Sequence, residues 1–126
     1  MTETAAHRIL VVEDNDFVRM QIVRFLRDAG HVCIEASTGD QGIEQMNAGI
    51  EVVVADVRME PVDGFAFIEA IRAKGFVQPV ILVTGDQNPD VLEKSSRFAV
   101  STILMKPIQK DRLLSMVARA VQKRTV

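Results

Sequence analysis

The chain has 126 residues, of which 48% are hydrophobic and 25% are charged, and its formal net charge is −2. These values are typical of one globular domain, and they give no electrostatic basis for binding nucleic acid or an anionic membrane. The single cysteine excludes an internal disulfide, and the lack of a signal core or of roughly 20 consecutive apolar residues predicts a soluble, cytoplasmic protein.

Short apolar runs predict five strands, and segments of helical periodicity predict a helix after each of them. In chain order we expect a strand from Ile9, a helix over 16–29, a strand from Val32, a helix from Thr38 to near Gly49, a strand from Val52, a helix from Asp63 to Gly75, a strand from Val80, a helix from Asn88–Pro89, a strand from Thr102 and a helix over 109–122. Thr38 with Gln41 is typical of a capping box, and Gly30 is typical of a helix stop.

The alternation of strands and helices predicts the fold. The runs at Ile9, Val52 and Val80 are continuously apolar, as in parallel strands that helices cover on both faces. Right-handed crossovers place helices on both sides of such a sheet. We predict a single α/β domain, a doubly wound sandwich whose five-stranded parallel sheet has the flavodoxin-like order 2-1-3-4-5. It covers 8–122, between a flexible N-terminal tail at 1–7 and a frayed C-terminus at 123–126.

Four of the predicted strands run into residues that could build one polar site: Glu13 and Asp14 after the first, Asp56 after the third, Thr84 after the fourth and Lys106 after the fifth. The carboxyl ends of parallel strands share one edge, where ligands bind in open α/β sheets. Three carboxylates in one cleft repel each other, and Mg²⁺ with its preference for oxygen ligands resolves the conflict. A carboxylate near Mg²⁺ can attack a phosphoryl group and form an acyl phosphate.

Each of these residues also has a simpler interpretation when it is taken alone. Asp56 could cap a turn, the acidic pair could be a solvated loop, Thr84 could be an ordinary strand residue, and Lys106–Pro107 could be a surface turn. Their joint placement at strand ends favours a site. His7 and His31 lie outside this set, and we predict both at the surface.

The chain resembles the receiver domain of two-component response regulators, the CheY-like superfamily, over essentially its whole length. The residues that carry the resemblance are Glu13–Asp14, Asp56, the loop from Met59 to Asp63–Gly64, Thr84 and Lys106–Pro107. The resemblance implies that Asp56 is the phosphoacceptor. It also implies a magnesium site in which Asp14 and Asp56 bind the ion directly, Glu13 binds through water, and the backbone carbonyl of Arg58 is a further ligand.

The resemblance implies partners as well. Lys106 would pair with the acceptor carboxylate and then with the phosphoryl group, while Thr84 would move toward that group and report its presence. The donor would be a phosphohistidine on a histidine kinase or a histidine phosphotransfer protein. Its helix would dock on the first-helix face, where Asn15, Val18 and Gln21 hold the docking positions. Val18 also fits the core-facing period, so its assignment stays open.

Ile103 and Glu60 depart from the family pattern, and Arg58 and Asp86 would border the phosphoryl group in this fold. Ile103 stands where the family usually has an aromatic switch residue, so phosphorylation should be reported more weakly or differently. Arg58 and Asp86 could form an ion pair across the mouth of the site, with independent solvated side chains as the alternative. Glu60 takes the place of the family's proline after the methionine, and it adds an acid near the site.

The sequence leaves several functions to compare. An aspartate-nucleophile phosphatase would need a second acid where Arg58 stands, and a nucleotide-binding enzyme would need a glycine-rich phosphate loop. We predict a receiver that is no enzyme beyond its own phosphorylation and dephosphorylation, that acts through protein contacts with a downstream target, and that is a monomer or weak dimer. The alternatives are a receiver excised from a hybrid histidine kinase or larger regulator, and a degenerate scaffold without phosphorylation.

Overall fold

The computed structural model describes residues 6–85, 89–97, 100 and 102–124. Strands and helices alternate strictly along the chain. They are β1 (Arg8–Val12), α1 (Asp16–Asp28), β2 (Val32–Ala36), α2 (Gly39–Gln45), β3 (Val52–Asp56), α3 (Gly64–Ala73), β4 (Val80–Thr84), α4 (Pro89–Arg97), β5 (Thr102–Met105) and α5 (Lys110–Arg124).

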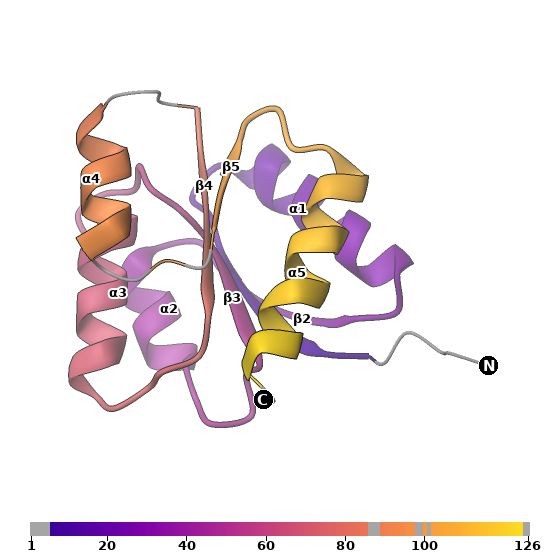
Figure 1. The fold of residues 1–126 in the computed structure, drawn as a ribbon, viewed down its shortest axis with the longest axis horizontal. Coiled ribbons are helices and arrows are strands. Elements are labelled where there is room, and N and C mark those ends of the chain that lie inside the picture. Colours follow the sequence, from indigo (N-terminus) through magenta and orange to yellow (C-terminus); the bar gives the residue numbers. More distant parts are fainter. Residues whose placement is uncertain (1–5, 86–88, 98–99, 101, 125–126) are drawn as a thin grey trace.

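The five strands form one parallel sheet in the order β2-β1-β3-β4-β5, which confirms the predicted fold. Helices cover both faces of this sheet. Figure 1 shows α1 and α5 on one face and α2, α3 and α4 on the other. The arrangement is a three-layer sandwich in which the central strands are buried from both sides.

Alternate residues of the central strands enter two separate hydrophobic cores. In β1, Ile9 and Val11 belong to the core under α1 and α5, whereas Leu10 and Val12 belong to the core under α2, α3 and α4. This follows from the two-residue period of a strand, because successive side chains point to opposite faces of the sheet. All residues of β3 and β4 are buried, which explains why their sequences are continuously apolar.

Side-chain caps begin three helices, including the cap predicted at Thr38. The side chains of Asn15, Thr38 and Asp63 each accept a hydrogen bond from a backbone N–H in the first turn of α1, α2 and α3. Gly30 and Gly75 follow α1 and α3 with φ of 93°, the left-handed conformation that glycine adopts without a steric penalty. The predicted cap of α4, Asn88, lies outside the described residues.

The predicted end of α2 near Gly49 is wrong, because the helix ends at Gln45. Asn47 accounts for the difference. Its side chain donates to the Gln45 carbonyl at 3.1 Å and accepts from the Gly49 N–H at 2.7 Å. Asparagine often competes with the helix in this way, by giving the backbone local hydrogen bonds of its own.

His31 is buried, contrary to the surface position that we predicted. Its Nδ1 accepts the backbone N–H of His7 at 3.1 Å, and the two rings stack with centroids 5.5 Å apart. Burial lowers the pKa of His31, and the neighbouring His7 lowers it further. His7 also contacts the Glu51 carboxylate, so it is tied to the start of the sheet. The domain bounds at 8–122 stay a prediction.

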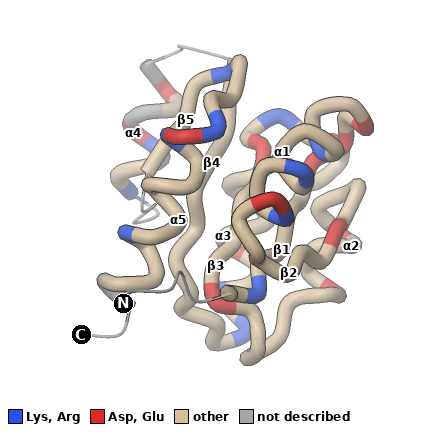
Figure 2. The backbone as a smooth tube through the Cα atoms, turned by 90° about the vertical axis from the view of Figure 1, so that its right-hand side faces the viewer, with Lys and Arg blue, Asp and Glu red and all other residues tan. Residues whose placement is uncertain are grey.

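Charged residues of both signs are interspersed over the side of the molecule in Figure 2. Within the described part of the chain, none of the helices combines the length and the apolar character needed to cross a membrane.

Candidate functional site

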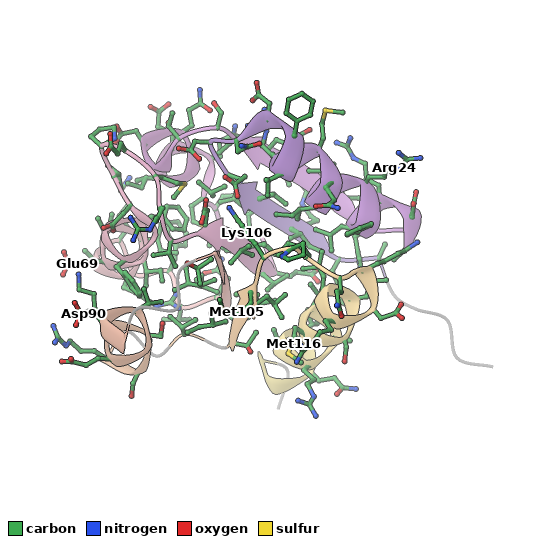
Figure 3. All side chains as sticks on the ribbon, turned by 90° about the horizontal axis from the view of Figure 1, so that it is seen from above. Arg24, Glu69, Asp90, Met105, Lys106 and Met116 are labelled. Carbon is green, nitrogen blue, oxygen red and sulfur yellow. The ribbon has the colours of Figure 1, made fainter. Side chains whose placement is uncertain are left out.

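The strand ends named by the sequence meet at one edge of the sheet. Asp56 ends β3 and pairs with Val83 of β4, and Thr84, the last residue of β4, pairs with Met105 of β5. The backbone N–H of Lys106 donates to the Thr84 carbonyl at 2.9 Å. Seen from above in Figure 3, Lys106 lies near the middle of the molecule, between the helices of the two faces.

Lys106 joins two of the three carboxylates. Its Nζ lies 3.0 Å from Asp56 Oδ2, with which it forms a hydrogen bond, and 3.2 Å from Glu13 Oε1. Asp56 and Glu13 are both buried. Glu13 Oε2 accepts the backbone N–H of Asn15 at 3.1 Å, but Oε1 has no hydrogen bond with any described residue. The ion pair with Lys106 therefore leaves a buried oxygen incompletely satisfied.

Burial also determines the protonation of the site. Burial raises the pKa of Glu13 to about 7; the Asn15 N–H lowers this pKa, and the nearby Asp56 charge raises it. Burial on its own lowers the pKa of Lys106, but its hydrogen bond and charge interaction with Asp56, together with Glu13, raise that pKa overall. Lys106 therefore stays an ammonium, whereas burial favours the protonated form of Glu13.

Glu13, Asp14 and Asp56 can place one carboxylate oxygen each within 4.8 Å of one another. One ammonium is too little positive charge for three clustered carboxylates. Carboxylate oxygens are also the ligand type that Mg²⁺ takes in proteins, usually with one or two carboxylates and several waters. Glu13 Oε1, which has an ion pair with Lys106 but no hydrogen bond, and the other oxygen donors of this cluster therefore fit a hard divalent cation. Asp14 is exposed, which leaves the cluster open to solvent.

A depression of about 400 Å³ is lined by Asp56, Arg58, Gly85 and Lys106. A second groove, of about 480 Å³, runs between the loop after β3 and α4, and its lining includes Glu60 and Asp14. The Arg58 backbone N–H donates to Asp56 Oδ1 at 3.3 Å. The Asp56 carboxylate is thus largely buried, and the depression leaves it reachable from one side.

Arg58 and Glu60 line the two depressions of this site. Arg58 is exposed, whereas Asp86 falls outside the described residues, so their ion pair stays a prediction. Ile103 pairs with Leu82 and packs, half-buried, against the core under α2, α3 and α4. It occupies the last strand as an aliphatic packing residue. Thr84 is buried at the end of β4.

The predicted docking positions on α1 differ in exposure. Asn15 and Gln21 are exposed, but Val18 is half-buried and packs against the core under α1 and α5. Our sequence reasoning missed two neighbours: Phe17 is 82% exposed and Met20 is 63% exposed. Their exposure could have been inferred from the sequence, because both large apolar residues fall outside the core-facing period of the helix.

Comparison with known proteins agrees with this geometry. Residues 9–118 match the response regulator receiver domain. The chain is 26% identical to the chemotaxis protein CheY of Treponema pallidum, over 94% of this chain and 85% of CheY. It is 27% identical to the transcriptional regulator NtrC of Escherichia coli, over 90% of this chain and 24% of NtrC.

Solved structures agree as well. CheY4 of Vibrio cholerae superposes with a TM-score of 0.85 at 25% identity, over 92% of this chain and 99% of that one. The chain spans less than a third of the length of several curated relatives that it matches. The match nevertheless covers most of the present chain, and the fold agrees with that of the solved receiver structures. The chain belongs to the response regulator receiver domain family of two-component signalling proteins.

Proposed function

We propose that this receiver domain accepts a phosphoryl group on Asp56 from a phosphohistidine, with Mg²⁺ as cofactor. The observation that carries the proposal is the position of Lys106, whose ammonium lies 3.0 Å from the acceptor carboxylate and 3.2 Å from Glu13 beneath an open depression. A catalytic site of this kind needs a nucleophile, a compensating cation and room for the incoming group. In this proposal Asp56 is the nucleophile, Lys106 is the cation, and the depression provides the room.

In the proposed reaction, a carboxylate oxygen of Asp56 attacks the phosphorus atom. The new O–P bond forms as the N–P bond of the phosphohistidine breaks, and the imidazole nitrogen keeps that electron pair and takes a proton. Lys106 holds the acceptor carboxylate before transfer and interacts with the phosphoryl oxygens afterwards. Thr84, at the end of the next strand, would donate its hydroxyl to the same oxygens.

The acidic cluster supplies the ligands for the cofactor. Asp14 and Asp56 would bind Mg²⁺ directly with the backbone carbonyl of Arg58, and Glu13 would bind through water. When it is bound, the ion neutralises the carboxylates and the charge that develops on the phosphoryl oxygens. Asp14 provides the exposed side of this ligand set.

The exposed face of α1 is the proposed docking surface for the donor, a histidine kinase or histidine phosphotransfer protein. Asn15 and Gln21 lie on it, and Phe17 and Met20 add large exposed apolar area next to the acidic turn. Exposed aromatic and methionine side chains are enriched at protein interfaces. Val18 would contribute from its half-buried position.

The output of the domain would be a protein contact with a downstream target, and we place it in the cytoplasm as a monomer or weak dimer. It catalyses no reaction beyond its own phosphorylation and dephosphorylation. Whether it acts alone or as part of a hybrid kinase or larger regulator depends on the protein that contains it. A scaffold without phosphorylation would not need the Lys106–Asp56 contact.

The direct test uses a small phosphodonor. The protein is incubated with Mg²⁺ and acetyl phosphate, and intact mass is measured for one added phosphoryl group. Asp56→Asn is the matched variant, because it keeps the size of the side chain and removes the nucleophile. We expect an adduct on the wild type only. An equal adduct on Asp56→Asn, or none on the wild type, would contradict the proposal.

The same assay tests the predicted role of Arg58 at the mouth of the depression. If the Arg58 side chain screens the acyl phosphate from water, Arg58→Ala should shorten its lifetime after the phosphodonor is removed. An exposed ion pair contributes only about 0–1 kcal/mol to stability, so the effect should be kinetic. An unchanged lifetime would remove this role from Arg58.

A further inference from the structure

Arg19 on α1 makes three hydrogen bonds to three different parts of the chain. Nη1 donates to the Glu13 backbone carbonyl at 2.8 Å, Nη2 donates to Asp16 Oδ1 at 2.7 Å, and Nε donates to Glu35 Oε1 at 3.2 Å. The side chain is only 16% exposed. Three donors in one rigid plane, each with its own acceptor, hold the guanidinium in one place.

The bond to the Glu13 carbonyl acts on the peptide unit that joins Glu13 to Asp14. A peptide unit is planar, so holding its oxygen restricts the rotation of the whole unit, including its attachment to the Asp14 Cα. The Glu13 carboxylate on one side of this unit faces Lys106, and the Asp14 carboxylate on the other side belongs to the acidic cluster. Arg19 thus constrains the direction in which both side chains leave the backbone.

The other two bonds of Arg19 fix the guanidinium itself. Asp16, three residues after Glu13, begins α1, so one side chain holds both ends of the turn over 13–16. Glu35 lies on β2, and its second carboxylate oxygen is 3.7 Å from Arg27 Nη2. Because Glu35 belongs to β2, its bond with Arg19 joins α1 to the sheet. Its contact with Arg27 of the same helix holds the Glu35 side chain in place.

We propose that Arg19 is a positioning residue for the magnesium site, which holds the Glu13–Asp14 peptide so that both carboxylates are presented to the ion. The inference rests on the proposed function, because it assumes that this cluster binds Mg²⁺. A lysine at this position would keep the charge, but its single nitrogen cannot bond to all three acceptors that surround the planar guanidinium of Arg19. Arg19 acts through Glu13 and Asp14.

Metal binding without a phosphodonor tests this role. Mn²⁺ is the probe, because it takes the same oxygen ligands as Mg²⁺ and its free form is measured by electron paramagnetic resonance. We expect Arg19→Lys to raise the Kd for Mn²⁺ by about tenfold or more, the usual effect of residues that orient metal ligands. The matched control is Arg24→Lys on the same helix, whose exposed side chain lies away from Lys106 in Figure 3. Its Kd should equal that of the wild type.

A second variant separates positioning from a general loss of structure. Glu35→Ala should raise the Kd in the wild-type background and have no further effect in Arg19→Lys, because it acts through Arg19. Thermal unfolding of every variant is followed by far-ultraviolet circular dichroism, and binding is measured well below each Tm. A residue with only a structural role would lower Tm and leave the Kd unchanged.

The outcomes distinguish the magnesium site from the positioning role of Arg19. A wild type that fails to bind Mn²⁺ would overturn the magnesium site, and with it the proposed function. A wild type that binds Mn²⁺, together with an equal Kd for Arg19→Lys, would overturn only the positioning role of Arg19.

Discussion

Gly64 lies directly against the backbone of Asp56. A Cβ atom on Gly64 would come within 2.5 Å of the Asp56 carbonyl oxygen and 3.0 Å of the Val57 Cα. The Gly64 N–H donates to the Val57 carbonyl at 2.9 Å. The start of α3 and the end of β3 therefore touch through main-chain atoms, and the proposed acceptor depends on a glycine eight residues away in sequence.

Gly64→Ala should destabilise the domain by about 1–3 kcal/mol, because main-chain atoms cannot move aside as a side chain would. It should also slow phosphorylation by acetyl phosphate, since relief of the clash moves Asp56. Urea unfolding by circular dichroism measures the stability. The control is Gly85→Ala, whose Cβ would meet nothing nearer than Lys106 Cδ at 4.0 Å. Equal stability of the two variants would contradict the close contact.

Glu13 predicts a pH dependence of stability in the absence of metal. Its pKa rises from 4.5 to about 7 on folding, chiefly through burial. The folded state then binds the proton more tightly than the unfolded state, so the contribution is complete below pH 4.5 and is lost as the pH rises to about 7. The contribution is on the order of 3 kcal/mol.

The measurement compares the wild type with Glu13→Gln in a metal chelator. Between pH 5 and pH 8, the wild type should lose stability relative to the variant, because only the wild type has a carboxyl group at position 13 that can ionise, while Asp56 is present in both proteins. His31 contributes the opposite trend, since its lowered pKa favours the folded state as the pH rises, but it is present in both proteins. Parallel pH profiles for the two proteins would mean that Glu13 does not titrate in this range.

Lys106→Met removes the ammonium that lies between Asp56 and Glu13 while keeping an unbranched side chain. We expect the rate of phosphorylation by acetyl phosphate to fall about 100-fold, since the transferred oxygens lose a charged donor. Lys110→Met is the control, because Lys110 is exposed and lies 3.8 Å from Asp28, away from the acceptor. A Lys106→Met rate equal to that of the control would exclude this role.

The strands could be predicted from the sequence because burial on both faces imposes a continuous apolar run, as in β3 and β4. The meeting of the strand-end residues at one edge could be predicted, because parallel strands bring their carboxyl ends together there. The end of α2 could not be predicted, because the Asn47 side chain competes with the helix through hydrogen bonds that no periodicity records. The burial of His31 could not be predicted either, because it involves a contact with His7, next to the start of β1.

Arg19 shows a further limit of sequence reasoning. In the helical period it is only one of three arginines between positions 19 and 27. Its importance arises from Glu35, sixteen residues away on β2, and from the direction of the Glu13 carbonyl. Such an assignment needs the relative positions of a helix and two strands, which the sequence does not contain.

We expect Phe17 and Met20 to affect the docking of the phosphohistidine protein but not the phosphorylation reaction at Asp56. The double variant Phe17→Ser, Met20→Ser should react with acetyl phosphate at the wild-type rate, because neither side chain lines the depression above Asp56. Transfer from a phosphohistidine protein that phosphorylates the wild type should slow about tenfold or more, as for a loss of apolar anchors at an interface. Both rates are measured by intact mass. A slowed acetyl phosphate reaction would instead indicate damage to the site itself.

Ile103 predicts a small response of the last strand to phosphorylation. Its side chain is stiff at χ1 because it is β-branched, and it is half-buried against the core under α2, α3 and α4. Adding Mg²⁺ and beryllofluoride, which mimics the acyl phosphate, should shift the NMR signals of the Ile103 methyl groups less than the amide signals near Asp56. Ile103→Val should cost about 0.5–1.5 kcal/mol of stability and leave the phosphorylation rate unchanged, because this position packs and does not react. Shifts at Ile103 as large as those around Asp56 would mean that an aliphatic side chain reports phosphorylation through this strand.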